Sequence, residues 1–226
     1  GETADTLSAL RIARKKGAST LALTNTVGST AARECDDVCY IRAGPEIGVA
    51  ATKTFSSQLV ALNALLEELV DDRAPKHDLA EALATLPSQV QQVLDDSNAR
   101  TIVETYRDAR SYFFLGRGIH YPVALEGALK FKEITYEHAE GFAAGELKHG
   151  PLALVTAETP VFAIVTGNGE ATQKTIGNVK EVEARDAPVI AVTDGVADVE
   201  RYVDHVLEIP ESHSRTAPVL ANVQLQ

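Results

Sequence analysis

Four ionisable side chains in the second half of the chain, Glu126, Lys130, Glu133 and Glu137, follow one another at intervals of three or four residues. Such intervals place side chains on one face of an α-helix, so the pattern predicts a polar stripe. A glycine-rich turn further along the chain then carries His149. Carboxylates, an ammonium group and an imidazole gathered in this way suit proton transfer on a small polar substrate.

The same stripe also fits an ordinary solvated helix face that is stabilised by ion pairs such as Glu126–Lys130. Two neighbouring segments favour the catalytic interpretation. The turn at 116–118, Gly-Arg-Gly, leads into the helix, and the polar turn that carries His149 follows it. The first turn is not a dinucleotide fingerprint, because a Tyr stands where the third glycine of that motif belongs.

Two segments of the first half are candidates for substrate binding. Gly1-Glu2-Thr3-Ala4 opens a helix, where free N–H groups, the helix dipole and the Thr3 hydroxyl suit a phosphate. Thr3 also fits a plain helix cap. The loop 48–53 precedes a long helix, a position at which doubly wound sheets bind ligands, although many such loops only connect elements.

Composition excludes several classes of function. The net charge of −11 is spread along the chain and argues against a nucleic-acid surface. No apolar run approaches the roughly 20 residues that span a bilayer, so we expect no membrane partner and a cytoplasmic location. His138, Glu140 and His149 have no metal-ligand spacing, and Cys35 and Cys39 are expected to be buried thiols. We therefore expect neither a metal nor a cofactor.

The elements that must position these groups alternate between strands and helices. Apolar runs predict strands, and a 3.6-residue period predicts helices. The expected helices are at 4–16, 52–70, 77–94, 96–109, 122–137 and 171–185, and the expected strands at 20–24, 37–42, 112–115, 160–165, 189–193 and 205–209. The polar segment 71–76 is expected to be a connection.

The order of elements repeats within the chain. Gly1-Glu2-Thr3-Ala4 begins a helix that leads to the strand Leu-Ala-Leu-Thr, and Gly169-Glu170-Ala171-Thr172 begins one that leads to Ile-Ala-Val-Thr. A short strand and a further helix follow in both copies, and the first copy lacks its opening strand. Strands that alternate with helices form parallel sheets. The echo therefore predicts an α/β protein with two similar halves.

The motifs together resemble a known family. The segments at 124–134 and 145–154, with 1–7 and 43–53 in the right order, closely resemble the isomerase domain of glucosamine-6-phosphate synthases, which consists of sugar-isomerase (SIS) domains. The resemblance covers nearly the whole chain. It implies two flavodoxin-like SIS subdomains, each a parallel sheet flanked by helices in three αβα layers, which we place at 1–93 and 94–226.

The resemblance also implies an activity. The family converts fructose 6-phosphate and ammonia into glucosamine 6-phosphate, and a separate glutaminase domain supplies the ammonia from glutamine. Glu133 would move a proton between C1 and C2 of the sugar imine, and Lys130 would assist. His149 would open the sugar ring and would reach the site from the neighbouring subunit of a homodimer. Substrate binding would fall to five residues: Thr3 at the phosphate, Val49, Ala51 and Thr52 at the sugar, and Glu126.

The sequence departs from the family pattern in places. The chain begins at the Gly of the family's Ser-Gln-Ser-Gly-Glu-Thr phosphate loop, and Ala51 stands where the family usually has a Ser. The chain also ends before the family's Schiff-base lysine and includes no glutaminase domain. We therefore expect this stretch, truncated at both ends, not to complete the synthase reaction alone.

Two alternatives share the fold. One is a stand-alone SIS-domain glucosamine-6-phosphate deaminase or sugar-phosphate isomerase that uses the same proton-transfer residues. The other is a non-catalytic SIS sensor that binds a sugar phosphate and regulates a partner. A sensor has no need for Glu133 and His149 together.

Overall fold

The computed structural model describes residues 1–69, 77–196 and 198–226. The chain forms two compact units, Gly1–Val70 and Asp71–Gln226, which we call the first and the second unit. The sequence predicts a different kind of division, into family subdomains at 1–93 and 94–226. That division stays a prediction. No helix in the described ranges is long and apolar enough to cross a membrane.

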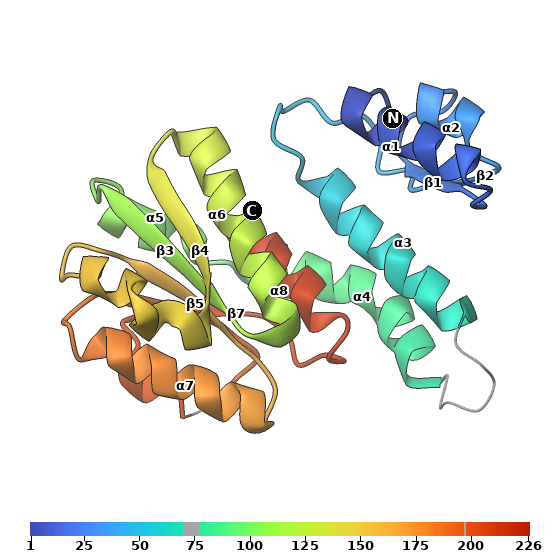
Figure 1. Ribbon diagram of the computed structural model, residues 1–226. Helices are drawn as coiled ribbons and strands as arrows, with labels where there is room; N and C mark the ends of the chain where they lie inside the picture. Colours follow the sequence, from blue (N-terminus) through green and yellow to red (C-terminus); the bar gives the residue numbers. More distant parts are fainter. Residues whose placement is uncertain (70–76, 197) are drawn as a thin grey trace. The chain divides into compact units, whose positions relative to one another are not determined.

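The first unit is a short α/β arrangement. Its elements in chain order are α1 (Ala4–Lys15), β1 (Leu21–Thr24), α2 (Thr30–Glu34), β2 (Asp37–Tyr40) and α3 (Lys53–Leu69). Strands β1 and β2 pair in parallel (Figure 1). Leu21 lies opposite Asp37 in this pair. The N–H of Ala32 donates to the Ser29 hydroxyl, which caps α2 and fixes the chain between the two strands.

The second unit is built on five parallel strands in the order β4-β3-β5-β6-β7 (Figure 1). The strands are β3 (Ser111–Gly116), β4 (His138–Ala143), β5 (Val161–Val165), β6 (Val189–Thr193) and β7 (His205–Glu208). The helices are α4 (His77–Asp96), α5 (Ala99–Tyr106), α6 (Tyr121–Thr135), α7 (Glu170–Glu183) and α8 (Ala217–Leu225), with short 3₁₀ turns η1 (Gly118–His120), η2 (Ala144–His149), η3 (Pro151–Leu154) and η4 (Glu200–Tyr202).

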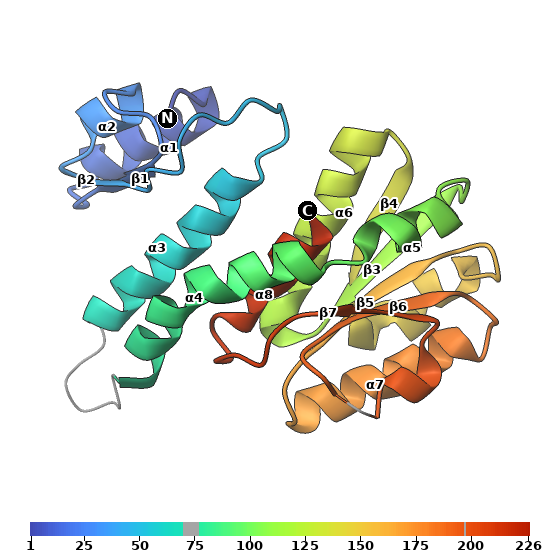
Figure 2. The same cartoon turned by 180° about the vertical axis from the view of Figure 1, so that it is seen from behind.

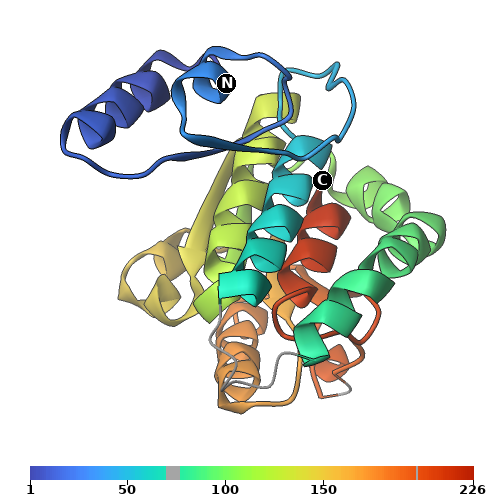
Figure 3. The same cartoon turned by 90° about the vertical axis from the view of Figure 1, so that its right-hand side faces the viewer.

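Helices cover both faces of this sheet, which explains why β5 and β6 are buried along their whole length. Phe113 and Leu115 of β3 share a buried cluster with Val179 of α7 and Leu147 of η2. Helix α7 covers this face of the sheet (Figure 2). Phe114 points to the opposite face, where its ring contacts that of Phe131 in α6. Helix α8 lies beside α6 on that face, and α4 packs against α8 (Figure 3).

The parallel sheets flanked by helices confirm the predicted fold class, and most predicted elements lie within a few residues of their place. The predicted helix at 122–137 ends early, because Tyr136 adopts a left-handed conformation with φ of 63°. Glu137 therefore lies beyond α6, and the predicted four-residue stripe is wrong in its last member. Strand β4 was not predicted.

Two further expectations have different outcomes. Cys39 is exposed on β2, and Cys35 is only half-buried, so the prediction of two buried thiols is wrong. The predicted connection at 71–76 lies outside the described residues.

Candidate active site

Helix α6 carries an ion-pair cluster formed by Glu126, Lys130 and Glu133. The Lys130 side chain is 5% exposed. Its Nζ lies 3.6 Å from Oε1 of Glu126 and donates directly to Oε2 of Glu133. The Glu126 side chain is 11% exposed and that of Glu133 40% exposed. The cluster thus runs from a buried carboxylate through a buried ammonium to a carboxylate that solvent or a substrate can reach.

Close packing of α6 on the edge strand fixes this cluster. A Cβ on Gly141 of β4 would stand 2.8 Å from Cα of Leu125, a distance that real side chains do not tolerate. Gly141 therefore lets the strand approach the helix backbone directly before Glu126, the first ionisable group of the cluster. The ring of Tyr112 in β3 lies 4.2 Å from that of Phe131, centroid to centroid, and anchors the same helix.

The electrostatics of the cluster follow from burial. Burial raises the pKa of Glu126, the Lys130 ammonium opposes this rise, and the Glu133 charge adds to it. A buried ammonium is stable only with paired charges and hydrogen bonds, which the two carboxylates provide. The arrangement suits a carboxylate base beside a fixed positive charge, as needed when negative charge develops on a substrate oxygen.

The structure places His149 apart from this cluster. His149 ends η2 and is exposed, and its side chain makes no hydrogen bond or ion pair with the residues that the structure describes. Leu147, two residues earlier, is fully buried in the cluster on the α7 face of the sheet, whereas α6 covers the other face. The predicted His149–Glu133 combination is thus not assembled by contacts within this chain.

The substrate-binding candidates of the first half lie in the first unit. Thr3 caps α1 through its backbone, its hydroxyl makes no capping bond, and it lines a cavity of about 940 Å³ that runs along β1. Val49 and Ala51 are exposed on the loop before α3. Thr52 is half-buried.

Glu46, which the sequence reasoning missed, closes this loop. Its Oε1 accepts hydrogen bonds from the N–H and the hydroxyl of Thr52, each at 2.9 Å, and its Oε2 accepts one from the Thr54 hydroxyl. Burial raises the pKa of Glu46, but the hydrogen bonds from Thr54 and Thr52 outweigh it and lower the pKa overall. The available signal was a single carboxylate in a loop of mainly glycine and apolar residues, six residues before Thr52.

The end of β1 holds the other side of the loop. Asn25 donates from Nδ2 to the carbonyl oxygen of Gly44 at 2.7 Å, and its Oδ1 accepts from the N–H of Ala43 at 2.8 Å. These bonds, with those of Glu46, hold the loop that carries Thr52 in the first unit. In the second unit, the structure brings Glu126, Lys130 and Glu133 together. Within the described residues, no group of three or more His, Cys, Asp or Glu side chains is placed to hold a metal ion.

Comparison with known proteins identifies the family of the chain. The family model described as "SIS domain" matches residues 1–68 and 105–226. A glutamine–fructose-6-phosphate aminotransferase (isomerizing) of Methanosarcina acetivorans is 53% identical over 233 residues, which cover all of this chain and 38% of that protein. The chain thus spans well under half the length of such curated relatives.

Two solved structures are similar over the whole chain. The C-terminal domain of glucosamine-fructose-6-phosphate aminotransferase from Francisella tularensis has a TM-score of 0.89 and 40% identity, with 65% of its chain covered. A glucosamine-6-phosphate deaminase from Thermotoga maritima has a TM-score of 0.74 and 25% identity, with 65% of its chain covered. Both carry the architecture described above.

Proposed function

The chain belongs to the SIS-domain family, and on that premise we propose that it is the sugar-isomerase part of a glutamine–fructose-6-phosphate aminotransferase. The whole protein would convert fructose 6-phosphate and glutamine-derived ammonia into glucosamine 6-phosphate. The observation that carries the proposal is the buried Lys130 held between Glu126 and the exposed Glu133. An isomerase needs such a base beside a fixed positive charge, and a simple binding module does not.

The proposed proton transfer uses the α6 cluster. Once ammonia has formed an imine at C2 of the open sugar, the Glu133 carboxylate removes a proton from C1. The electron pair of that C–H bond forms the C1–C2 double bond of an enolamine, and the imine nitrogen takes up a proton from water. Glu133 then returns its proton to C2, and the C1 hydroxyl loses its own to water to leave an aldehyde. The Lys130 ammonium stabilises charge that develops at the oxygen on C1, and Glu126 holds Lys130 in place.

The remaining roles complete the proposal. Thr3 binds the phosphate, and Val49, Ala51 and Thr52 contact the sugar. We further propose that the subdomains are 1–93 and 94–226 and that the full-length protein includes a glutaminase domain. The full-length protein works in the cytoplasm and binds neither nucleic acid nor membrane.

His149 opens the sugar ring of a neighbouring subunit in a homodimer. Its exposure, and the burial of Leu147 on the sheet face opposite α6, support this last assignment.

The decisive experiment is Glu133→Gln in the full-length protein, with formation of glucosamine 6-phosphate from fructose 6-phosphate and glutamine as the readout. Loss of a general base typically slows a reaction by about a hundredfold to ten-thousandfold, and we expect a loss in that range. The matched control is Glu137→Gln, since Glu137 lies beyond the end of α6 and is exposed. If the natural protein forms no glucosamine 6-phosphate, and Glu133→Gln leaves ligand binding and regulation of a partner untouched, the sensor would be favoured instead.

The deaminase is the second candidate because the Thermotoga maritima structure shares the fold over the whole chain. A deaminase releases ammonia from glucosamine 6-phosphate and needs no glutamine. Incubation of the full-length protein with glucosamine 6-phosphate alone separates the two functions. We expect no ammonia release, and rapid release would replace the proposed function with this one.

A further inference from the structure

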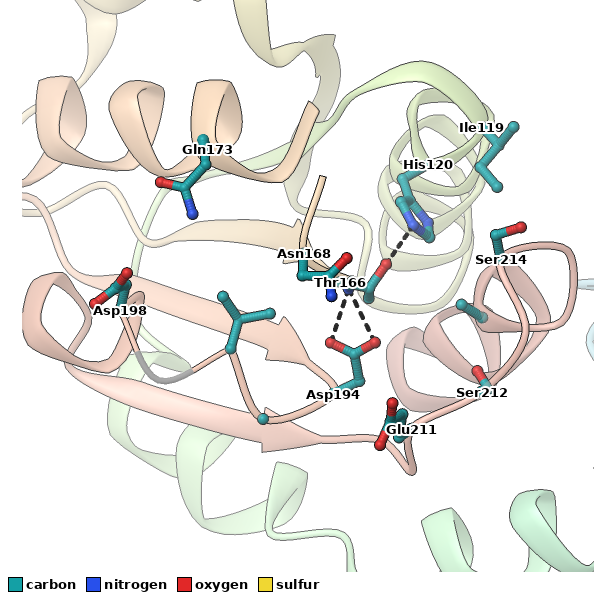
Figure 4. Close-up of a pocket in the computed structure, with 14 residues that line it drawn as sticks. Ile119, His120, Thr166, Asn168, Gln173, Asp194, Asp198, Glu211, Ser212 and Ser214 are labelled. Carbon is teal, nitrogen blue, oxygen red and sulfur yellow. Dashed lines mark hydrogen bonds between the residues drawn. The ribbon is translucent and has the colours of Figure 1, made fainter. Parts of the chain in front are cut away.

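A separate cavity of about 680 Å³ opens in the second unit at the carboxyl ends of β5, β6 and β7 (Figure 4). Its walls are the turns that follow these strands, together with Ile119 and His120 of η1. Ligands of parallel α/β sheets bind at this edge, and the volume lies within the range of small-molecule sites. The lining does not include the described residues of the α6 ion-pair cluster.

Two buried polar atoms of the lining have no partner. Nε2 of His120 forms a hydrogen bond of 2.7 Å with the Thr166 hydroxyl, which leaves Nδ1 buried and unbonded (Figure 4). The hydroxyl oxygen of Ser212, on the turn after β7, is also buried and unbonded. A buried polar group without a partner is energetically unfavourable, so such groups are commonly satisfied by a ligand or water.

The charge of the cavity is negative. Asp194, Asp198 and Glu211 line it, and its described lining contains no Lys or Arg. Burial lowers the pKa of His120 to about 4 despite the opposing charge of Asp194, so the imidazole is neutral at pH 7. A dianionic phosphate would meet three carboxylates and no cation, which Coulomb repulsion opposes.

The turn between β5 and α7, where an anion could bind, already holds the carboxylate of Asp194. The N–H of Gly167, just before α7, donates to both carboxylate oxygens of Asp194, at 3.0 and 2.9 Å. The internal repeat makes the contrast plain: the residue after β1 is the neutral Asn25, and the residue after the equivalent β6 is Asp194. The second copy therefore places a carboxylate of its own at the head of its helix.

We propose that this cavity binds an unphosphorylated polyhydroxylated amine, of the amino-sugar class. Its hydroxyl groups would donate to the carboxylates and bond to Ser212 and His120, and its ammonium group would supply the positive charge that the lining lacks. Asn168 and Gln173 add amide donors and acceptors at the same opening. This inference does not depend on the proposed function of the α6 cluster.

Calorimetric titration of the full-length protein with glucosamine tests the proposal, with glucose and glucosamine 6-phosphate as comparators. We expect glucosamine to bind about tenfold more tightly than glucose, which lacks the charge. Asp194→Asn and Glu211→Gln should each weaken glucosamine binding by about tenfold. Glu211→Gln is the more robust variant, because Glu211 is exposed and its carboxylate is not needed to hold a loop.

Matched variants separate this cavity from the proposed active site. Glu200→Gln removes an exposed carboxylate that does not line the cavity, and it should leave glucosamine binding unchanged. Glu211→Gln should not weaken binding of glucosamine 6-phosphate. The proposal is overturned if glucosamine does not bind at millimolar concentrations, if glucose binds equally well, or if Glu133→Gln abolishes glucosamine binding while Glu211→Gln preserves it.

Discussion

At the scale of single residues, Lys130 shows why a buried charge belongs to a group rather than to one side chain. Its ammonium is nearly inaccessible, and one of its two carboxylate partners, Glu126, is almost as buried. Removing one partner from a buried ion pair leaves an uncompensated charge, which costs more than the pair itself contributes. The stability of α6 and the availability of Glu133 as a base are therefore linked.

Lys130→Met tests this link. The substitution leaves Glu126 buried without its cation, so we expect the free energy of unfolding to fall by about 3 kcal/mol at neutral pH. Adding Glu126→Gln in the same chain removes the stranded charge and should restore most of that loss. Urea unfolding of the three proteins, followed by circular dichroism, measures both changes. A double variant no more stable than Lys130→Met would contradict the assignment of Glu126 as the stranded partner.

His120 gives a prediction of pH dependence. Its pKa falls from 6.5 to about 4 on folding, because burial disfavours the charged imidazole. Below pH 6.5 the unfolded chain binds a proton that the folded protein does not, so stability declines as pH falls through this window. The full effect, reached near pH 4, is about 3 kcal/mol.

The measurement is the free energy of unfolding between pH 7 and pH 4 for the natural chain and His120→Gln. The carboxylates that face this cavity, Asp194, Asp198 and Glu211, are present in both proteins, so their own titration largely cancels in the difference. We expect the natural chain to lose about 3 kcal/mol more than the variant. Parallel curves would show that His120 titrates normally.

At the scale of elements, residue spacing predicted which side chains share a helix face. It did not predict where the helix ends or that β4 forms. The spacing of Glu126, Lys130 and Glu133 was sufficient to place them on one helix face. The left-handed Tyr136 that ends the helix carries no such signal, so Glu137 was wrongly included. Strand β4 reads His-Ala-Glu-Gly-Phe-Ala, which lacks a run of apolar residues, and it forms because β3 offers a free edge beside α6.

Gly141 tests how tightly that edge strand holds the helix. In Gly141→Ala the new methyl group would meet the backbone of Leu125, so strand or helix must shift, and overpacking of this kind costs about 1–3 kcal/mol. Gly177→Ala in α7 is the control: nothing lies within 4 Å of its added Cβ, and alanine favours a helix by about 0.5–1 kcal/mol. Thermal unfolding should show opposite shifts, and equal shifts would refute the close-packing argument.

At the scale of the whole molecule, the internal repeat predicted two α/β arrangements but not how they differ. The echo between 1–4 and 169–172 correctly marks the starts of α1 and α7. It shows Asn25 after β1 and Asp194 after β6, but it does not reveal that the Asp194 carboxylate accepts from the N–H of Gly167 whereas the Asn25 amide bonds to the backbone of 43–44. That difference depends on side-chain contacts, which a repeat in the sequence cannot specify. The role of a residue from another subunit is still harder to read from one chain.

Subunit mixing tests the proposed exchange of His149 between protomers. In full-length protein, Glu133→Gln and His149→Ala should each be nearly inactive alone. If His149 serves the neighbour's site, a mixed dimer contains one site with both variants and one with neither. Random reassembly of equal amounts should therefore restore about a quarter of the natural activity, because half the dimers are mixed and half their sites are intact. If both residues serve the same subunit, every site in the mixture lacks one of them and no activity returns.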